Sequence, residues 1–488
     1  MLISDLFKNI PHRIIQGNEN SLDIKQIEID SRKVEPDTLF ICITGLTTNG
    51  HDYISSAVTN GATAILVEKE DLQLPKEITV IHVENTREVM SYVAANFYDN
   101  PANKLRLIGV TGTNGKTTVT CFIEEILRNC GRKTGLIGTT GAKIGTENLD
   151  ISFATSTTPD PLELHKIFAH MLKAGVQDVV IEVTSHALVL HKTKGLTFHV
   201  GVFTNLTQDH LDIHGTMENY RLAKAELFAQ SKHGVVNIDD ESTPTMISKL
   251  GSNPFTTYAI ENKTNLRAIH INHCPEFSEF KVNDMNYKLV PRGKFNIYNA
   301  LAAISTAEVL GLDRNKIREA VSQIKGVPGR IQSVVNNYGY NVYVDYAHTP
   351  DGLQNIITAV REFTKGRVIT IFGCGGDRDK DKRPIMGKVA GKLSDYCIIT
   401  SDNPRTENPM DIINQVEEGI KQTNTDYLVI ENRFNAIIQG VRLLSYGDSL
   451  IIAGKGHEDY QIIGTTKHDF DDYKVAEKAI SDRGEVIS

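Results

Sequence analysis

The stretch that decides the fold is Gly109-Val-Thr-Gly-Thr-Asn-Gly-Lys116-Thr117-Thr118, which follows the apolar run 105–110 and opens a helix-like segment. Backbone N–H groups of a glycine-bearing loop at a helix N-terminus converge on phosphate oxygens. In such a loop Lys116 can span the outer phosphates, and the Thr117 hydroxyl can ligate magnesium. The order of strand, glycine loop and helix therefore predicts a nucleotide-binding protein.

The segment departs from the strict P-loop pattern at one position. That pattern requires glycine where this chain has Val110, and the nearest glycine, Gly109, lies one residue earlier. The alternative is an ordinary turn rich in glycine and threonine. Because the strand, Gly-Lys-Thr and the helix follow one another in the required order, the phosphate-binding interpretation is favoured.

The composition indicates a globular enzyme of several domains. The chain has 488 residues, 40% hydrophobic and 23% charged, which suggests about three domains of ordinary size. Its net charge of -8 argues against general electrostatic binding of nucleic acid or anionic lipid. We therefore expect no nucleic-acid partner and no membrane partner.

The N-terminal residues and the cysteines indicate the compartment. Residues 1–8 lack the pattern of a secretory signal, and no apolar run approaches membrane-spanning length. The cysteines are scattered without a CxxC pair or nearby ligand histidines, so neither zinc nor a disulfide framework is predicted. We expect a cytoplasmic monomer. The cysteines are Cys42, Cys121, Cys130, Cys274, Cys374 and Cys397.

Three domains are predicted, covering residues 1–103, 104–327 and 328–488. Asn100-Pro-Ala-Asn103 is the first expected linker, and Gly326-Val-Pro-Gly-Arg330 is a turn. Alternating strand-like and helix-like segments predict an α/β protein with a central P-loop ATPase domain, built on a mainly parallel sheet, and a C-terminal Rossmann-like domain. Strand-like runs lie at 38–43, 64–67, 79–83, 105–110, 178–183, 200–204, 367–372, 395–400 and 449–453, and helices near 117–129, 161–174 and 218–230.

Polar residues follow several of these runs, and ligands of open α/β sheets collect beyond the carboxyl ends of the strands. Glu182 closes one run and can complement Thr117 as a magnesium ligand if the two strands are neighbours. His210, soon after the next strand, can join them. Taken singly, such residues are more often caps or surface residues, and Glu182 fits either interpretation equally.

Lys224 lies on the buried stripe of a predicted helix. Met217, Tyr220, Leu227 and Phe228 share its face at helical spacing. The residue pattern alone favours snorkelling, in which the alkyl stem covers apolar surface and the ammonium reaches water. The alternative is an amine with a lowered pKa that can be chemically modified.

Two arginines follow two later strands, Arg378 in Gly-Gly-Asp-Arg and Arg405 in Ser-Asp402-Asn403-Pro404-Arg405. Their guanidinium groups suit the recognition of carboxylate or phosphate. Asn403-Pro404 enforces a non-helical turn that presents Arg405 rigidly. Either arginine also fits a surface ion pair, and most of the charged run 377–383 is expected to be solvated.

The chain carries a long series of ordered segments. They are Asp30-Ser-Arg32 with Leu39-Phe40, Thr111-Gly-Thr-Asn-Gly-Lys-Thr117, Ser156-Thr-Thr-Pro159, Glu182 with Ser185-His-Ala187, Asp209-His-Leu-Asp-Ile-His214, Gly293-Lys-Phe-Asn296, Pro328-Gly-Arg330, Asp345-Tyr-Ala-His348, Asp402-Asn-Pro-Arg405 and Gly454-Lys-Gly-His-Glu458. In this order they resemble the Mur ligase family, the ATP-dependent amide-forming enzymes of peptidoglycan precursor synthesis, over essentially the whole chain.

The resemblance is strongest to the member that adds the third peptide residue. It implies that meso-2,6-diaminopimelate is joined to UDP-N-acetylmuramoyl-L-alanyl-D-glutamate with ATP and magnesium, through an acyl phosphate that the incoming amine attacks. The implied catalytic residues are Lys116, Lys224, His210 and Glu182. Magnesium would be held by Thr117, Glu182, His210 and Lys224 in the form of a carbamate.

The resemblance also implies the binding residues. ATP would contact Thr111, Gly112, Thr113, Asn114, Gly115, Lys116, Thr117, Asn296 and Arg330. Ser31 and its neighbours would bind the uridine nucleotide, and Thr157, Thr158, Thr184 and Lys192 would contact the muramyl dipeptide. The incoming diamino acid would be held by Arg378, Asp402, Asn403, Pro404, Arg405, Gly454 and Glu458.

Specificity depends on Arg405 and on two departures from the family pattern. Lysine lacks the second carboxylate of diaminopimelate and would leave the Arg405 guanidinium unpaired, at a cost of about a few kcal/mol. Thr184 stands where the family usually has serine, and Lys192 stands where arginine is common. Thr184 keeps the hydroxyl, whereas Lys192 keeps the positive charge but loses the two-pronged guanidinium group. Recognition of the dipeptide is therefore expected to be altered or weaker.

Two rival interpretations stay open. One is a related amide ligase that acts on folate or poly-γ-glutamate, or that adds lysine to the dipeptide; the segments 30–32 and 402–405 disfavour the first two. The other is a non-catalytic nucleotide-binding relative. The intact set of Lys116, Thr117, Glu182, His210 and Lys224 argues against it.

Overall fold

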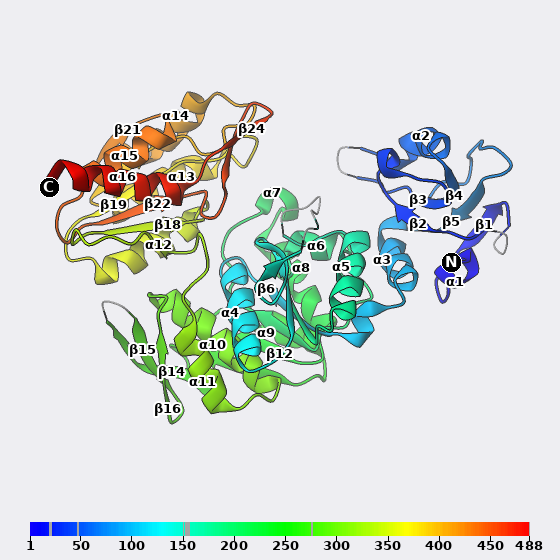
Figure 1. The fold of residues 1–488 in the computed structure, drawn as a ribbon, viewed down its shortest axis with the longest axis horizontal. Coiled ribbons are helices and arrows are strands. Elements are labelled where there is room, and N and C mark those ends of the chain that lie inside the picture. Colours follow the sequence, from blue (N-terminus) through cyan, green and yellow to red (C-terminus); the bar gives the residue numbers. More distant parts are fainter. Residues whose placement is uncertain (19–21, 46–47, 150, 152–156, 275–276, 488) are drawn as a thin grey trace.

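The computed structural model describes residues 1–18, 22–45, 48–149, 151, 157–274 and 277–487. Three lobes follow one another along the chain, each with its own large sheet, and the N-terminal and C-terminal lobes lie on either side of the central one (Figure 1). This is the predicted three-part α/β architecture. The domain boundaries at 103/104 and 327/328 stay predictions, and Ser156 of the segment 156–159 lies outside the described residues.

The N-terminal lobe contains a five-stranded sheet in the order β1-β5-β4-β3-β2, parallel except for β1. Its strands β3, β4 and β5 confirm the three apolar runs predicted there. The elements are α1 Ile3–Leu6, β1 Arg13–Gln16, β2 Gln26–Glu28, η1 Ser31–Lys33, β3 Thr38–Ile41, η2 Gly50–Tyr53, α2 Ile54–Thr59, β4 Ala62–Val67, β5 Thr79–His82, α3 Thr86–Phe97 and η3 Pro101–Lys104.

The central lobe contains an eleven-stranded sheet in the order β16-β15-β14-β13-β12-β11-β6-β10-β7-β8-β9. Strand β6 pairs in parallel with both β10 and β11. The strand that ends in Glu182 therefore neighbours the strand that leads into the phosphate loop, so the condition for Glu182 to complement Thr117 is met. Antiparallel strands extend the sheet at both edges.

The predicted central helices are confirmed as α4, α5 and α8. The elements of this lobe are β6 Arg106–Thr111, α4 Lys116–Asn129, β7 Thr134–Gly138, β8 Gly141–Ile144, β9 Glu147–Asn148, α5 Pro161–Lys173, β10 Asp178–Glu182, α6 Ser185–Val189, β11 Val200–Phe203, α7 Leu211–His214, α8 Met217–Ala229, β12 Gly234–Asn237, α9 Thr243–Leu250, β13 Phe255–Ala259, β14 Leu266–His273, β15 Ser278–Val282, β16 Met285–Leu289, α10 Lys294–Val309 and α11 Arg314–Gln323.

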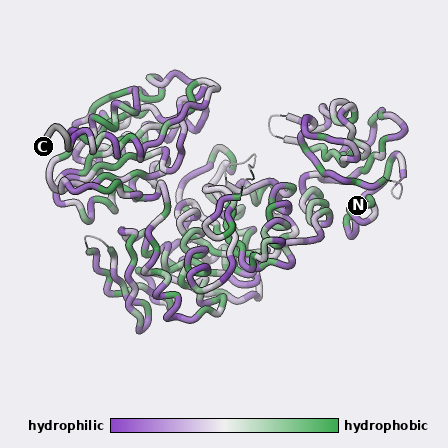
Figure 2. Tube along the Cα trace, in the orientation of Figure 1, coloured by the Kyte–Doolittle hydropathy of each residue, from purple (hydrophilic) through white to green (hydrophobic). Residues whose placement is uncertain are grey.

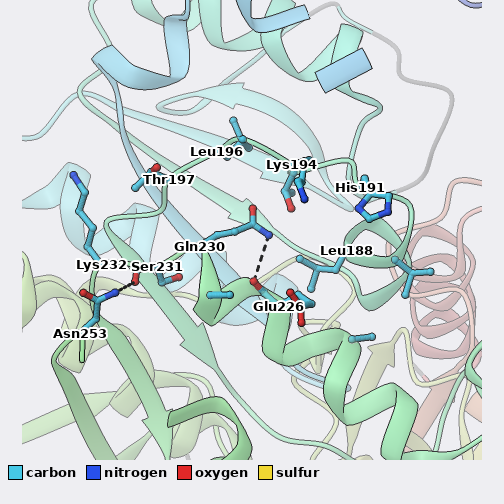
Figure 3. A pocket seen from close by; sticks show the side chains of 15 residues that line it. Leu188, His191, Lys194, Leu196, Thr197, Glu226, Gln230, Ser231, Lys232 and Asn253 are labelled. Atoms are coloured by element: carbon cyan, nitrogen blue, oxygen red, sulfur yellow. Dashed lines mark hydrogen bonds between the residues drawn. The ribbon is translucent and has the colours of Figure 1, made fainter. Parts of the chain in front are cut away.

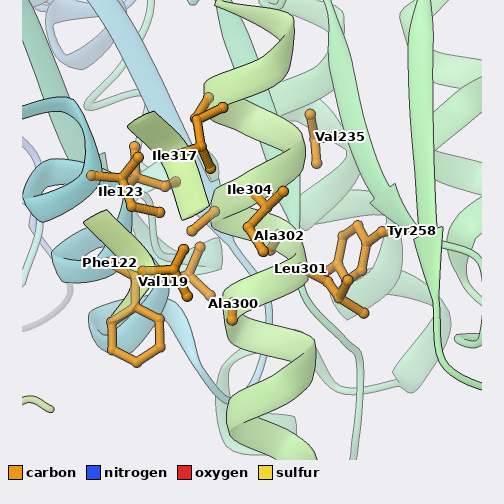
Figure 4. Close-up of a cluster of buried hydrophobic side chains, with 14 of the residues drawn as sticks. Val119, Phe122, Ile123, Val235, Tyr258, Ala300, Leu301, Ala302, Ile304 and Ile317 are labelled. Atoms are coloured by element: carbon orange, nitrogen blue, oxygen red, sulfur yellow. The ribbon is translucent and has the colours of Figure 1, made fainter. Parts of the chain in front are cut away.

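Helices α4 and α10 pack together and anchor the phosphate loop. Val119, Phe122 and Ile123 of α4 share one buried cluster with Leu301 and Ile304 of α10 (Figure 4). Burying a large apolar side chain contributes about 1.5–3 kcal/mol. Because α4 begins directly after the loop, this core fixes the helix whose first turn carries the loop lysine and threonine.

The C-terminal lobe contains a six-stranded sheet in the order β17-β18-β22-β19-β20-β21, parallel except for β17, and a separate hairpin of β23 and β24. Strands β19, β20 and β22 confirm the predicted runs. The elements are β17 Gln332–Ser333, β18 Asn341–Asp345, α12 Pro350–Phe363, β19 Val368–Phe372, α13 Lys382–Leu393, β20 Tyr396–Ile399, α14 Pro409–Ile420, β21 Asp426–Val429, α15 Arg433–Leu443, β22 Ser449–Ala453, β23 Tyr460–Ile463, β24 Thr466–Asp469 and α16 Asp472–Ile487.

Polar contacts cross between the lobes. Ser91 Oγ of α3 donates a hydrogen bond of 2.6 Å to the Lys194 carbonyl in the central lobe. On the other side, Thr207 Oγ1 donates to Asp351 Oδ2 of α12 at 3.0 Å, and Asn114 Nδ2 donates to the same oxygen. The phosphate loop is therefore in direct contact with the C-terminal lobe.

Hydrophobic residues are spread over all three lobes (Figure 2). Within the described ranges, none of the helices combines the length and the apolar character that crossing a bilayer requires.

Candidate active site

Two glycines shape the phosphate loop. A Cβ on Gly112 would lie 1.9 Å from Thr204 Oγ1, so the loop passes too close to the end of β11 for a side chain. Gly115 has a φ of +84°, a conformation that glycine adopts without strain. Gly109 lies within β6, where a Cβ would meet Leu227 at 2.8 Å. The glycine that this loop needs is therefore Gly112, and Gly109 serves the packing of the strand.

The loop is tied to the segment that follows β11. Thr113 N donates to the Asn205 carbonyl at 2.8 Å, and Asn114 N donates to Asn205 Oδ1 at 2.9 Å. Thr204 Oγ1 donates to the Asn114 carbonyl at 2.7 Å. A helix N-terminus leaves its first N–H groups without intrahelical partners, and α4 begins at Lys116. Loop and helix together form an anion site at the carboxyl edge of the sheet.

Two lysines converge on one carbonyl of this loop. Lys224 Nζ donates to the Gly112 carbonyl at 2.7 Å and Lys116 Nζ donates to it at 3.1 Å. Lys224 is 1% exposed, and burial together with the charge of Lys116 holds its pKa well below the ordinary value of 10.5. Burial also lowers the pKa of Lys116. The snorkelling interpretation is wrong, because the Lys224 ammonium ends inside the protein and does not reach water.

Glu182 is a buried carboxylate that accepts hydrogen bonds from two threonines of the site. It is fully buried at the end of β10, and Thr117 Oγ1 donates to its Oε2 at 3.1 Å. Thr139 donates to it twice, from N to Oε1 at 3.0 Å and from Oγ1 to Oε2 at 3.1 Å. A Cβ on Gly138 would lie 2.3 Å from Oε1, so the carboxylate takes this position only because residue 138 is glycine.

The Thr117 hydroxyl and the Glu182 carboxylate fit magnesium. They are adjacent hard oxygen donors, the ligand type that Mg²⁺ prefers, and nucleotide sites commonly supply one or two protein ligands while phosphate and water complete the shell. In the described part of the chain, no three His, Cys, Asp or Glu side chains gather into a metal-binding group.

His210 lies at the edge of this arrangement. It precedes α7 with a φ of +52°, and its side chain is 49% exposed beside Asp209. Its ring centroid lies 6.1 Å from that of Tyr220, and Lys224 Nζ lies 4.4 Å from the centroid of the same ring. The two predicted catalytic residues therefore share Tyr220 as a neighbour.

Arg330 reaches the phosphate loop from the C-terminal side. Its Nη2 donates to Thr117 Oγ1 at 3.2 Å, and its guanidinium lies 4.6 Å from the centroid of the Tyr346 ring, within the range of a cation–π contact. The next residue, Ile331, has a φ of +44°, which is strained for a β-branched side chain. Ile331 N donates to Asp345 Oδ2 at 2.7 Å, and this bond holds the turn that aims Arg330.

Asn296, the other predicted ATP contact, acts with a residue that sequence reasoning missed. Asn299 Nδ2 donates to Asn296 Oδ1 at 3.2 Å. Asn299 Oδ1 would lie 2.6 Å from a Cβ on Gly115, so this amide touches the phosphate loop directly. The spacing of three residues on α10 places both amides on one helix face and was the available signal.

Four of the five predicted dipeptide residues lie together beside the end of β10. Thr184 N donates to Thr158 Oγ1 at 3.2 Å, and Lys192 Nζ donates to the Thr158 carbonyl at 3.2 Å. Thr157 Oγ1 lies 3.2 Å from Thr139 Oγ1 and so joins the group to the Glu182 network. Ser31 does not join them, because it belongs to η1 of the N-terminal lobe.

Lys192 is a structural anchor as well as a candidate ligand. It is 6% exposed and its Nζ lies 3.1 Å from Asp160 Oδ1, at the N-cap of α5. The positive charge is therefore paired and directed into the protein. In place of the arginine that the family pattern commonly has, this lysine offers a single point charge and no fork.

The hairpin β23–β24 forms hydrogen bonds with segment 402–405, which is predicted to bind the incoming amino acid. Arg405 N donates to the Ile462 carbonyl at 3.1 Å, and Ile462 N donates to Asn403 Oδ1 at 2.9 Å. Gln461 Nε2 donates to the Asp402 carbonyl at 2.6 Å. These bonds hold the segment through both its backbone and its side chains.

Side chains of segment 402–405 contact the 454–458 loop, which contains the predicted ligands Gly454 and Glu458. Asn403 Nδ2 donates to Glu458 Oε2 at 2.9 Å. A Cβ on Gly454 would lie 2.4 Å from Asp402 Oδ2, so the glycine allows the carboxylate to approach the end of β22. Asp402 and Asn403 are buried, while Glu458 is partly exposed.

The two predicted arginines flank Gly375. A Cβ there would lie 3.0 Å from Arg405 Nη1 and 3.7 Å from Arg378 Cγ. Arg405 Nη1 donates to the Gly376 carbonyl at 2.8 Å, and its Nε and Nη2 have no partner among the residues that the structure describes. Arg378 is exposed. Both guanidinium groups thus remain able to receive a carboxylate.

The turn at 329–330 connects the part of the site around the phosphate loop with the part around the 454–458 loop. A Cβ on Gly329 would lie 2.2 Å from His457 N, so the 454–458 loop packs on the turn that carries Arg330. Burial and the charge of Arg330 lower the pKa of His457 to about 4, and a hydrogen bond with the backbone of Thr139 acts in the opposite direction. The 454–458 loop therefore contacts both the turn that carries Arg330 and Thr139, the residue that donates to Glu182.

A separate cavity of about 620 Å³ lies beside α8 (Figure 3). Glu226 of α8 and Gln230, which caps this helix, line it together with His191 and Lys194 from the connection between α6 and β11, whereas Lys224 does not. None of the predicted site residues lines this cavity. Apart from Ser31, the predicted site residues lie in the central and C-terminal lobes.

Models of Mur ligase domains match most of the chain. The Mur ligase family catalytic domain matches residues 23–98, the Mur ligase middle domain residues 110–307, and the Mur ligase glutamate ligase domain residues 329–456. The chain belongs to the Mur ligase family.

Individual relatives extend the match over the full length. A protein of Caldanaerobacter subterraneus subsp. tengcongensis named UDP-N-acetylmuramoyl-L-alanyl-D-glutamate--2,6-diaminopimelate ligase is 45% identical, with 99% of each chain covered. A protein of the same name from Halalkalibacterium halodurans is 44% identical, with 96% of each covered. A solved structure of a ligase of that name superposes with a TM-score of 0.70 at 30% identity, and 99% of each chain is covered.

Proposed function

We propose that the protein is an ATP-dependent ligase that adds meso-2,6-diaminopimelate to UDP-N-acetylmuramoyl-L-alanyl-D-glutamate in peptidoglycan precursor synthesis. It releases ADP and phosphate, requires magnesium, and works as a cytoplasmic monomer. Full-length relatives at 44–45% identity that carry this name support the choice of substrates.

The observation that carries the proposal is the position of the Thr117 hydroxyl. It donates to Glu182 at 3.1 Å and accepts from Arg330 at 3.2 Å. One point therefore joins the phosphate loop, an acidic magnesium ligand and an arginine from the C-terminal side. Such a point is where a triphosphate and an attacking carboxylate would have to be brought together.

The chain's residues position anions and supply no nucleophile. The glutamyl γ-carboxylate of the dipeptide attacks the γ-phosphorus, ADP leaves, and the amine then attacks the acyl phosphate and expels phosphate. Lys116, Arg330 and the N–H groups at the start of α4 neutralise charge that moves between these anions. Magnesium held by Thr117 and Glu182, with His210 nearby, would reduce the repulsion between carboxylate and triphosphate.

We further propose that Lys224 carries a carbamate. The amine is buried, its pKa is lowered by burial and by Lys116, and Lys116 lies beside it at the Gly112 carbonyl. A neutral amine can form a C–N bond to carbon dioxide and release a proton to solvent, and the resulting carbamate anion would be stabilised by the neighbouring ammonium. The modification would add a second anionic oxygen ligand to the one that the Glu182 carboxylate provides.

The preference for diaminopimelate rests on Arg405. Its Nη1 is held by the Gly376 carbonyl, so the fork is oriented before the amino acid arrives. Diaminopimelate offers a second carboxylate to the remaining donors, and lysine does not. Leaving a partly buried guanidinium unpaired costs about 1–3 kcal/mol, which corresponds to roughly 5- to 150-fold in kcat/KM.

The test supplies ATP, magnesium and UDP-N-acetylmuramoyl-L-alanyl-D-glutamate to the purified protein and measures phosphate release with diaminopimelate, lysine, ornithine or no amino acid. We expect release that depends on diaminopimelate. Equal turnover of lysine and diaminopimelate would overturn the assigned specificity. No phosphate release with any of them would favour a non-catalytic nucleotide-binding protein.

A further inference from the structure

We propose that Lys455 is a positioning residue of the amino-acid site, which orients Asn403 and Glu458 and thereby sets the affinity for the diamino acid. The inference rests on the proposed function and deepens it. Lys455 stands two residues after β22, between the predicted ligands Gly454 and Glu458. Its side chain is completely buried.

Lys455 closes a ring of three side chains. Its Nζ donates to Asn403 Oδ1 at 3.2 Å and lies 3.1 Å from Glu458 Oε2. Asn403 Nδ2 donates to the same Glu458 oxygen at 2.9 Å. Each member thus contacts the other two, so the orientation of one depends on the presence of both others.

The ring fixes which way the Asn403 amide faces. Its Oδ1 accepts from Lys455 and also from Ile462 N at 2.9 Å, so two donors define the oxygen side. The Nδ2 side must then face Glu458. Because an amide presents donors on one side and an acceptor on the other, reversal would place two donors against Lys455 and Ile462 N. Removing Lys455 takes away one of the two constraints.

The same ring reaches Arg405 through the hairpin. Ile462 donates from its N–H to Asn403 and accepts at its carbonyl from Arg405 N at 3.1 Å. A change in the position of Asn403 is therefore transmitted to the backbone of the arginine that we assign to the second carboxylate. None of these bonds involves a residue of the phosphate loop.

The burial of the charge indicates why a lysine is present. A buried ammonium is costly unless it is paired, and breaking such a pair by removing one partner is strongly unfavourable. Here the partner, Glu458, is 16% exposed and forms part of the amino-acid site. A hydrophobic residue would fill the volume equally well, so what the cation adds is the fixed geometry of Asn403 and Glu458.

The experiment compares Lys455→Met with the unmodified protein in the phosphate-release assay. We expect the KM for diaminopimelate to rise about tenfold or more, because a charged hydrogen bond is lost, while the KM for ATP changes less than about twofold. Lys467→Met is the matched control, since Lys467 lies 3.7 Å from the Tyr460 ring centroid but is exposed. It should leave both constants unchanged.

A double-mutant cycle separates positioning from stability. If Lys455 acts through Asn403, Lys455→Met should have little further effect on the KM for diaminopimelate in an Asn403→Ala background. Full additivity would overturn the inference, as would unchanged kinetics or an equal rise in both KM values. Lys455→Gln, which keeps a donor, serves if the methionine variant does not fold, with a smaller rise expected in the KM for diaminopimelate alone.

The phosphate-release assay on the unmodified protein tests the proposed function before any variant is compared. Phosphate release that no amino acid stimulates would defeat the proposed function, whatever Lys455 does. Release with an amino acid, together with kinetics of Lys455→Met that match the unmodified protein, would defeat only the role of Lys455.

Discussion

Lys224 Nζ and the Gly112 carbonyl lie 2.7 Å apart, so a helix more than one hundred residues away in sequence meets the phosphate loop at a single carbonyl. Lys116 donates to the same oxygen at 3.1 Å. Two ammonium groups that share one acceptor in a buried site repel each other, and this favours a neutral or modified Lys224.

Lys224→Ala is expected to lower kcat by about 100- to 1,000-fold, because removal of a group that stabilises charge in the transition state has effects of that order. If the carbamate is present, formate or acetate should restore part of the activity by supplying a carboxylate in the space left behind. Lys232→Ala, at an exposed lysine beyond the end of α8, is the control and should be neutral. Full activity of Lys224→Ala would contradict the assignment.

Thr139→Val should lower kcat by about 10- to 100-fold, because the hydroxyl that donates to Glu182 Oε2 at 3.1 Å is lost while the shape is kept. Thr139→Ser should retain most of the activity. Thr140→Val provides the comparison next to it, since Thr140 Oγ1 is buried without a hydrogen-bond partner in the described part of the protein. Steady-state kinetics with saturating ATP measure the effect, and equal losses at both threonines would contradict it.

Arg433→Met is expected to destabilise the C-terminal lobe by about 3–5 kcal/mol, because it leaves the Asp472 carboxylate buried and unpaired. Both side chains are fully buried and their closest atoms, Nη2 and Oδ2, lie 2.7 Å apart. The double variant Arg433→Met/Asp472→Leu should recover much of the loss. Arg442→Met, at an exposed position of the same helix, should change stability by less than about 0.5 kcal/mol in urea unfolding.

His165 should make the protein less stable as the pH falls from about 6.5 to about 4. Burial lowers the pKa of this histidine to about 4, whereas in the unfolded chain it is near the ordinary 6.5. Between these values the unfolded state binds one more proton, so stability decreases with acidification. His165→Phe should flatten the dependence of Tm on pH in this window, and His170→Phe, at an exposed position of α5, should not.

Much of the architecture could be predicted because its signals are local. Apolar runs and glycine positions mark β6, β10 and β11, and the rule that ligands collect at strand ends singled out Glu182 before its neighbours were known. The same rule applied to β7 would have found Thr139, which follows that strand directly. Lys455 gave no such signal, because a single lysine in a loop is ordinarily exposed.

The sequence by itself determined the order of strands and helices, the nature of the loop at 109–118 and the residue types available for catalysis, because backbone preferences and apolar periodicity act over a few neighbouring residues. Only the tertiary structure decided that Lys224 is buried, that Gly112 and not Gly109 shapes the loop, and that Arg330 meets Thr117. These features depend on distances between segments far apart in the chain, and burial and charge pairing arise only when those segments pack together.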